Sequence, residues 1–334
     1  MASWRDVFQI GAVAVGLDIG KRTIKVAEIR RTVKGIELRR FGIGPTPVGS
    51  IEGGLILDRV ALAGAISTVL RDAKIRSRHV VIAVTGQNVL ARTLRLPPIP
   101  EDEIRQAIRW EAERHLPIPV DDAVLDVQLV REIVDDGQRQ IEVLLAAAPE
   151  GLVISYIEAL DTARLTVDAV EVGALAMARA LGEMVERGTR ALVNLGASTT
   201  DLAIVRDGVP QFTRTILSGQ EAVARTSAVP ESGEHADAFA LASGLDELLT
   251  QLRRSLDFYR AQFGGATIDG GVLCGGGARI PRIDRHFALE LDLPMTIGTP
   301  LVGVELHSSL EPAVFNVAAP QLVVATGLAM RTVV

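Results

Sequence analysis

The stretch of the chain with the clearest chemical potential is Val15–Ile29, which holds a carboxylate, a glycine, a hydroxyl and a cation at close spacing. Asp18 stands two residues before Gly20, and Thr23 and Lys25 follow. Glycine adopts backbone angles that other residues avoid, so consecutive amides of a turn at Gly20 can converge on an anion. A carboxylate at Asp18 is placed to hold Mg²⁺ through its water shell. Together these residues predict a cradle for a phosphate and a metal ion.

A second stretch, residues 192–208, can be laid over the first without a gap. In this overlay Asn194 corresponds to Asp18 and Gly196 to Gly20. A single Asp–x–Gly turn is usually only a hairpin turn, but a repeated one is more informative. Two copies of one strand–turn–strand unit predict two similar halves that face each other across a cleft, each with a phosphate-binding turn.

A third candidate lies later in the chain, where a predicted strand at 270–273 runs into Gly275, Gly276 and Gly277 before a predicted helix. Three glycines at such a place let the backbone approach a planar or anionic ligand closely. Alone, this run could equally be a glycine-rich connector. The two phosphate turns favour the ligand-binding interpretation.

Alternating strands and helices must position these motifs. Apolar residues at helical spacing predict an amphipathic helix over 55–74 and a long helix from Leu241 to Phe263. The apolar stretch Ala313–Met330 is broken by polar residues and by Pro320, so a buried strand and helix explain it better than a membrane span. The chain is expected to close with a helix over 321–331.

The character of the sequence changes between residues 87 and 168. A strand closed by Pro97–Pro98 is followed by a helix over 101–114, an extended Pro-rich linker and two strands. The two strands meet at Asp136–Gly137, the strongest hairpin signal in the chain. We therefore expect a compact α+β module inserted into the first half.

Composition limits the classes of protein to consider. The 334 residues exceed what one core usually serves, and a net charge of -6 argues against nucleic-acid binding. The single cysteine, Cys274, allows no internal disulfide, and the histidines lack metal-ligand spacing. The N-terminal residues do not resemble a signal peptide. We expect a soluble cytosolic protein, with Cys274 as a small buried strand residue.

Two phosphate turns followed by a strand–glycine–helix element occur in this order in the actin-like ATPases, which include actin, the heat-shock chaperones, sugar kinases and bacterial FtsA. The chain resembles that superfamily from Val15 to Arg331. The resemblance implies an α/β, actin-like fold of two duplicated ribonuclease H-like halves with an inserted α+β subdomain. It also implies ATP and Mg²⁺ as cofactors.

Site residues follow from the same resemblance. The expected cofactor-binding residues are Asp18, Gly20, Lys21, Arg22, Thr23, Lys25, Gly196, Ala197, Ser198, Thr199, Asp201, Gly219, Gln251, Arg254, Gly275, Gly276, Gly277 and Arg279. Asp18 and Asp201 are the expected metal ligands. No catalytic residue is assigned firmly, and Asp18 and Asn194 are the candidates.

The inserted module narrows the resemblance further. Residues 109–130, RWEAERHLPIPVDDAVLDVQLV, and the LPPIPEDEIRQAI that precedes them resemble the type IV pilus assembly protein PilM family, as do residues 206–219 and 253–262. The resemblance implies a cytoplasmic position at the inner-membrane face. It implies a groove between the first subdomain and the insertion that receives the N-terminal peptide of the inner-membrane protein PilN. The pilus assembly ATPases and a second copy of the chain are further expected partners, with membrane contact only through a partner.

The same resemblance divides the chain into four subdomains. We expect subdomain 1A at 13–86, 169–188 and 318–334, subdomain 1C at 87–168, subdomain 2A at 189–224 and 267–317, and subdomain 2B at 225–266.

The chain departs from the actin-like pattern at several positions. The second phosphate turn opens with Asn194 instead of an acid, and an amide carries no charge to attract Mg²⁺ or activate water. A small polar pair of the first turn is replaced by Lys21–Arg22, and Gln251 stands where a glutamate near the base is expected. These changes favour nucleotide binding over turnover, so we expect weak or no ATPase activity.

Other interpretations stay open at the level of sequence. An FtsA-like filament former should carry a C-terminal amphipathic helix, and a GspL-like protein should continue into a transmembrane segment; we expect neither here. A small-molecule kinase of the same superfamily would need a second pocket with a general base. Trp110 either packs its helix onto a sheet or anchors a partner protein.

Overall fold

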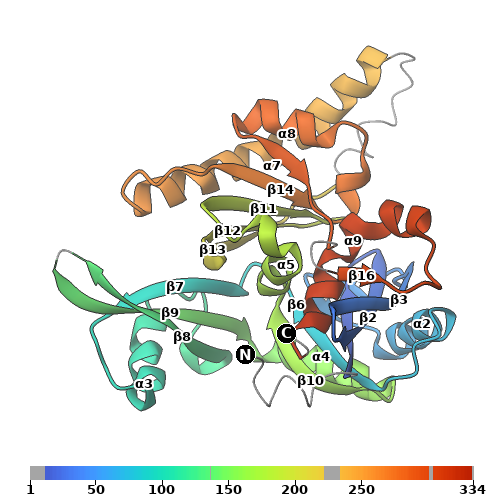
Figure 1. Cartoon of the computed structure of the whole chain (residues 1–334), viewed down its shortest axis with the longest axis horizontal. Helices are drawn as coiled ribbons and strands as arrows, with labels where there is room; N and C mark the ends of the chain where they lie inside the picture. The colour runs from blue at the N-terminus through green and yellow to red at the C-terminus, as the bar shows by residue number, and fades with distance from the viewer. Residues whose placement is uncertain (1–11, 136, 222–233, 301–303, 333–334) are drawn as a thin grey trace.

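The computed structural model describes residues 12–135, 137–221, 234–300 and 304–332, which form two large mixed sheets, a smaller sheet and the helices around them (Figure 1). The first sheet contains, in spatial order, β10 (Thr166–Val172), β6 (His79–Val84), β1 (Val13–Ile19), β2 (Thr23–Thr32), β3 (Gly35–Pro45) and β16 (Val304–Leu306). The second contains β13 (Val209–Ile216), β12 (Thr200–Arg206), β11 (Thr189–Leu195), β14 (Gly270–Cys274) and β15 (Met295–Ile297).

The central hairpins of the two sheets have the same register. In the first, the β1–β2 pairs run from Val13 with Arg30 to Ile19 with Ile24. In the second, β11 and β12 pair from Thr189 with Arg206 to Leu195 with Thr200, which is the same set of positions in the sequence overlay. Each first strand also has a parallel neighbour, β6 or β14. The predicted duplication is confirmed.

Two helices, α5 (Gly173–Leu181) and α9 (Pro312–Met330), lie between the sheets and contact strands of both (Figure 1). The outer face of the first sheet is covered by α2 (Arg59–Asp72) and α4 (Glu150–Thr162). The second sheet is covered by α7 (Glu234–Gln262) and α8 (Ile283–Leu291). One apolar core joins residues of both sheets through the central helices, so the two halves share a buried interior.

Helix α9 packs unusually closely on its neighbours. A Cβ atom on Gly16 of β1 would lie 1.9 Å from the carbonyl oxygen of Ala325, and one on Gly327 would lie 1.8 Å from that of Ala176 in α5. Only glycine fits at these two contacts. In length and composition α9 would suit a membrane crossing, but 72% of its most apolar stretch is buried inside the protein. It is therefore a core helix.

The strand expected in the first part of 313–330 is wrong, because one helix spans the whole stretch, whereas the helix expected over 321–331 is confirmed as the C-terminal part of α9. Pro320 lies inside this helix, and its carbonyl accepts a hydrogen bond from the Gly275 amide at 2.8 Å. Burial between two sheets favours a helix that is apolar on all sides. The helix expected over 55–74 begins later, at Arg59, because the Asp58 side chain caps the free Ala61 amide at 2.9 Å. Leu55 instead belongs to a short hairpin, β4 (Ile51–Glu52) and β5 (Leu55–Ile56).

The inserted module is a sheet of β7 (Leu90–Leu96), β9 (Gln138–Pro149) and β8 (Ala123–Asp135), with α3 (Glu101–Ala112) and the short helix η1 (Val120–Asp122). It has an apolar core of its own. The hairpin turn was expected at Asp136–Gly137; residue 136 lies outside the described residues. Strand β10 pairs with β6 and α4 packs on α2, so both belong to the first half. We therefore propose that the insertion ends near Pro149, earlier than the expected 168.

One edge of the module's sheet is docked on the second half. The Ala91 amide of β7 donates to Thr213 Oγ1 at 2.8 Å, and Thr93 Oγ1 donates to the Pro210 carbonyl at 2.6 Å. Among the described strands, β8 forms the other edge of this sheet and pairs only with β9.

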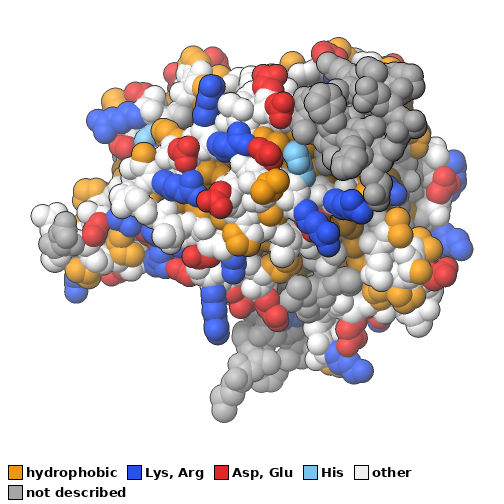
Figure 2. All heavy atoms as spheres, turned by 90° about the horizontal axis from the view of Figure 1, so that it is seen from above, with side chains coloured by type: hydrophobic (Ala, Val, Ile, Leu, Met, Phe, Trp, Pro, Cys, Tyr) orange, Lys and Arg blue, Asp and Glu red, His pale blue; other side chains and the backbone are white. Residues whose placement is uncertain are grey.

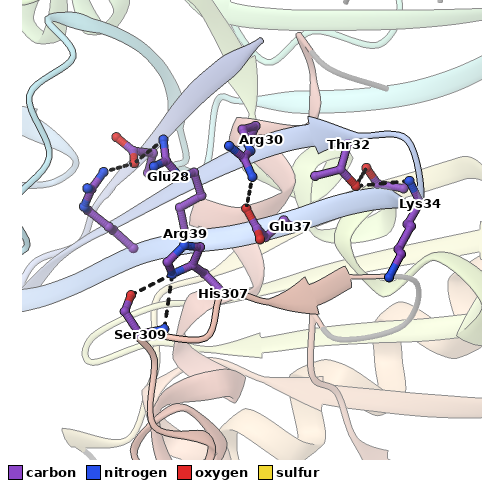
Figure 3. A network of polar contacts seen from close by, with 10 residues as sticks. Glu28, Arg30, Thr32, Lys34, Glu37, Arg39, His307 and Ser309 are labelled. Atoms are coloured by element: carbon purple, nitrogen blue, oxygen red, sulfur yellow. Dashed lines mark hydrogen bonds and ion pairs between the residues drawn. The ribbon is translucent and has the colours of Figure 1, made fainter. Parts of the chain in front are cut away.

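Polar side-chain contacts join β2 to β3, and further contacts lie within the segment after β16 (Figure 3). Glu28, which is 3% exposed, accepts a hydrogen bond from Arg40 and lies 3.9 Å from Arg39. Farther along the hairpin, Arg30 pairs with Glu37 at 3.0 Å. A buried carboxylate needs such partners because desolvation of a charge is costly. Seen from above, cationic, acidic and apolar side chains are interspersed, and neither sign of charge dominates that face (Figure 2).

Candidate functional site

The two predicted phosphate turns have the same backbone geometry. In the first, the Gly20 amide donates to the Thr23 carbonyl at 3.0 Å. In the second, the Gly196 amide donates to the Thr199 carbonyl at the same distance. Both turns connect the first two strands of their sheets, so the fold presents two equivalent turns.

The ammonium group of Lys25 lies beside the first turn. Asp18 and Lys25 are directly opposite each other on β1 and β2, and Lys25 Nζ is 2.9 Å from Asp18 Oδ2. A Cβ atom on Gly20 would lie 3.2 Å from the same Nζ. The side chains of the pair are only 12% and 17% exposed. Lys25 therefore supplies positive charge beside the turn and also occupies a carboxylate that a metal ion would use.

The second turn carries a different pair at the same two positions. Asn194 Nδ2 donates to Asp201 Oδ2 at 3.3 Å, and Thr215 Oγ1 donates to Asp201 Oδ1 at 2.7 Å. Burial raises the pKa of Asp201, while the two hydrogen bonds oppose that rise and the charge of Asp18 adds to it. The acid of this hairpin therefore stands on its second strand, whereas in the first hairpin the acid stands on the first strand.

An ion pair links the two halves beside these turns. Arg22 Nε of the first turn lies 2.7 Å from Glu221 Oε1. The backbone amides of Gln220 and Glu221 donate to the carbonyls of Gly196 and Ala197, both at 2.9 Å, so Glu221 is tied to the second turn. The sequence reasoning named Arg22 and missed Glu221, because nothing local marks a partner 199 residues away.

The glycine loop packs directly against the second turn. Gly275 has φ +88°, and a Cβ atom there would lie 2.5 Å from Asn194 Oδ1. A Cβ atom on Gly277 would lie 2.3 Å from a side-chain carbon of Leu195. Gly276 is more open, because the nearest atom to its Cβ position is the side-chain Nε2 of Gln220, at 3.3 Å. The loop continues into a 3-10 turn, η3 (Gly276–Arg279), and α8 begins only at Ile283.

Close packing on the second turn also requires glycine at position 219. A Cβ atom there would lie 2.6 Å from the Gly196 carbonyl oxygen and 2.7 Å from that of Ala197.

Thr46, which the sequence reasoning missed, holds the first turn, because its hydroxyl donates to the Gly20 carbonyl at 2.7 Å. A lone threonine after a strand carries no signal for this role.

Two predicted residues lie apart from the turns and the glycine loop. Lys21 belongs to the first turn and Arg279 ends η3, and both of their side chains are exposed. Gln251 and Arg254 line a pocket of about 350 Å³ on α7 together with Arg214. Among the described residues, that pocket shares none with the turns or the glycine loop. The structure thus brings the two turns, Gly219 and the glycine loop together, and places Gln251 and Arg254 in a separate pocket.

A metal ion at this site would rely on two carboxylates. Within the described ranges, no group of three or more His, Cys, Asp or Glu side chains could hold a metal. Mg²⁺ commonly takes one or two carboxylates, phosphate oxygens and several waters, so Asp18 and Asp201 suit it when phosphates are present. Because both already accept hydrogen bonds, they would contact the ion through its waters.

Cys274 lies behind the site on β14 and is fully buried. Its sulfur is 3.4 Å from Met177 Sδ. Burial, and then the charges of Asp201 and Asp18, raise the pKa of the thiol. Cys274 is the small buried strand residue that the sequence predicts, and it is not poised as a nucleophile.

Comparisons with known proteins add three findings. The model of the family described as type IV pilus assembly protein PilM matches residues 16–333. A solved PilM-PilN type IV pilus biogenesis complex aligns with a TM-score of 0.82 and 29% identity, covering 96% of this chain and 98% of that one. MreB 5 of Spiroplasma citri bound to AMPPNP aligns with a TM-score of 0.52 and 13% identity, covering 94% of each chain. That last likeness concerns the fold alone, and the fold is actin-like.

A curated relative, the cell division protein FtsA of Borreliella burgdorferi, is 25% identical over 232 residues. The match covers 61% of this chain and 55% of FtsA, so the chain spans about half the length of that relative.

Proposed function

Because the chain belongs to the type IV pilus assembly protein PilM family, we propose that it is an actin-like scaffold of the type IV pilus assembly machinery that binds ATP with Mg²⁺ between its halves. The observation that carries this proposal is the pair of equivalent turns, each closed by the same hydrogen bond and tied to the other by Arg22 and Glu221. Such turns present backbone amides to phosphate groups.

Each cluster residue has a separate role in this proposal. The amides after Gly20 and Gly196 bind phosphate oxygens, and Lys25 adds positive charge beside the first turn. Gly276 leaves room for the nucleoside. Asp18 and Asp201 hold Mg²⁺ through water, and the ion neutralises phosphate charge when bound. Gln251 and Arg254, on α7, contact the nucleotide only if α7 approaches the turns.

Slow or absent hydrolysis follows from the same residues. Asn194 has no charge to activate water, and its amide is already used on Asp201. Lys25 neutralises the Asp18 carboxylate. The bound nucleotide would therefore act by holding the cleft closed, which it does to the extent that it binds the closed form more tightly.

The N-terminal peptide of a PilN-like inner-membrane protein would dock where the module meets the first half. Helix α4 contacts β8 and β9 of the module there. Three apolar side chains on these elements, Val124, Ile154 and Ile157, are each more than 40% exposed. The edge strand β8 offers unpaired backbone groups to an extended peptide. Such a partner would place the protein on the cytoplasmic face of the inner membrane.

Trp110 on α3 is a further candidate contact. It is 70% exposed, so the alternative in which it packs its helix onto the sheet is wrong. Exposed tryptophan is enriched among residues that dominate binding energy.

The test is a titration with fluorescent ATP, with and without Mg²⁺, followed by the PilN N-terminal peptide. We expect saturable ATP binding that Lys25→Ala removes and that Lys34→Ala, at an exposed hairpin tip, leaves unchanged. We expect ATP to strengthen peptide binding, and Ile154→Glu to weaken it without affecting ATP. Peptide binding without ATP binding would refute the nucleotide role. ATP binding without peptide binding would refute the PilN-like partner.

The relationship to FtsA favours a second candidate, a membrane-recruited scaffold that self-assembles. Sedimentation with and without ATP separates the two candidates. Filaments that form without any PilN peptide would favour the FtsA-like alternative, whereas a monomer or dimer that binds the peptide would favour the first.

A further inference from the structure

A basic groove of about 840 Å³ lies on the outer face of the first half, along α2 and at the C-terminal end of α4. Its rim carries five cations, Arg71, Lys74, Arg76, Arg78 and Arg164, and its floor is formed by the buried residues Ala63, Leu70, Ile75 and Ala163. Among the described residues, no acidic side chain lines it, although the chain as a whole has a net charge of -6. The groove lies near the start of β6, whereas the turns follow the opposite ends of the strands.

Both helices end in an unusual way at this groove. Lys74 and Arg164 adopt left-handed backbone angles, with φ +57° and +58°. The amide after each donates back to the helix at 2.9 Å, from Ile75 to Leu70 and from Leu165 to Leu160. This C-terminal motif normally places glycine at the left-handed position, because a side chain there is strained. The favourable interaction of a cation with the helix dipole offsets part of that strain.

In the middle of α2, glycine stands at a position where a helix usually carries a side chain. Gly64 lines the groove, and a Cβ atom there would meet nothing within 4 Å. Glycine inside a helix is less stable than alanine, so packing gives no reason for it. Side chains therefore stand where glycine is usual, and glycine stands where a side chain is usual, around one groove. Local rules are commonly broken in this way at functional surfaces.

The cations of the rim are available to a partner. Among the described residues, Lys74, Arg76, Arg78 and Arg164 have no ion pair, and Arg71 contacts only its neighbour Asp72, at 3.4 Å. Unpaired cations of one sign attract acidic partners at long range and select against basic ones.

We propose that this groove binds an acidic peptide segment of a partner protein, whose apolar side chains enter the floor and whose carboxylates meet the rim. The concave shape favours a peptide over a bilayer surface, which is flat. The apolar floor favours a peptide over an inorganic phosphate, which would use only the cations. The open space at Gly64 would admit one of the apolar side chains of the peptide.

The test uses a fluorescein-labelled peptide of alternating Glu and Leu residues and its Lys–Leu counterpart. We expect the acidic peptide to bind, with affinity that falls as salt is added. The double variant Arg76→Glu with Arg78→Glu should lower that affinity about tenfold or more. The matched control, Arg187→Glu with Arg285→Glu, reverses two exposed arginines outside the groove and should bind as the wild type does.

Gly64→Leu provides an independent variant, because it fills the floor without changing charge. It should weaken peptide binding while the melting temperature does not fall. Equal binding of the two peptides, or equal loss in the charge-reversal variant and its control, would overturn the proposal. Binding of phosphatidylglycerol vesicles or of inorganic phosphate in place of the acidic peptide would overturn it as well.

Discussion

The contact between β1 and α9 makes Gly16 a position where one methyl group should disrupt the fold. In Gly16→Ala the new Cβ atom would lie 1.9 Å from the Ala325 carbonyl oxygen and 2.8 Å from Leu328 Cβ. Ordinary contacts begin near 3.4 Å, so α9 would have to move away by about 1.5 Å. Because the obstacle is backbone, no side-chain rotation can relieve it.

The cost of that movement can be estimated from the packing. Helix α9 touches strands of both sheets, so a shift away from β1 also disturbs its contacts with the second half. Overpacking a core costs about 1–3 kcal/mol and sometimes more, and a backbone obstacle places this variant at the upper end, about 3 kcal/mol. A typical domain has only about 5–15 kcal/mol of stability in total. Asp18 lies two residues further along the same strand, so ATP binding should weaken too.

Thermal unfolding followed by circular dichroism measures this effect. We expect Gly16→Ala to lower the melting temperature by about 5 °C or more. Gly64→Ala is the matched control: its methyl group enters open space, and alanine is about 0.8–1 kcal/mol better than glycine inside a helix, so the melting temperature should rise by about 2 °C. If Gly16→Ala has the same melting temperature as the wild type, the close packing of α9 on β1 is refuted.

Three further predictions concern the site. Because the folded-state pKa of Asp201 is raised, the ionised carboxylate destabilises the protein at neutral pH. The variant Asp201→Asn should therefore be more stable than the wild type at pH 7.5. Calorimetry should show this difference in stability shrinking as the pH falls toward the pKa of the unfolded state. Burial raises the pKa of Cys274, so a disulfide-exchange reagent should modify it only after denaturation, and rapid modification of the folded protein would contradict its burial. Arg22→Glu and Glu221→Arg should each weaken ATP binding by about fivefold at most, since an exposed ion pair contributes up to about 1 kcal/mol. The double variant that carries both substitutions should restore the affinity for ATP. A failure to restore it would argue against a link between the halves.

Local pattern was enough to predict the turns and their duplication. The alternation of apolar residues before Asp18 and after Thr23 sets which side chains face inward, and Gly20 sets where the strand turns. The same spacing around Gly196 then produces the same register, as the two hairpins show. These are interactions between residues close in the chain, which sequence spacing determines directly.

Helix limits and subdomain limits depended on packing between distant segments. The stretch that includes Pro320 reads as broken in isolation, yet it forms one helix because two sheets bury it. Strand β10 follows the inserted module in the sequence but pairs with β6 in the first sheet. Neither outcome has a local signal, because each depends on a surface built elsewhere in the chain.

By itself, the sequence determined the two turns, the glycine loop, the inserted module and the family resemblance, since each depends on residue type and short spacing. Only the tertiary structure decided that Arg22 meets Glu221, that Gln251 and Arg254 lie in a separate pocket, and that α2 and the C-terminal end of α4 line a basic groove. The physical reason is that spacing along a strand or helix fixes the face on which a side chain lies, whereas its distant partner is set by how whole elements pack against one another.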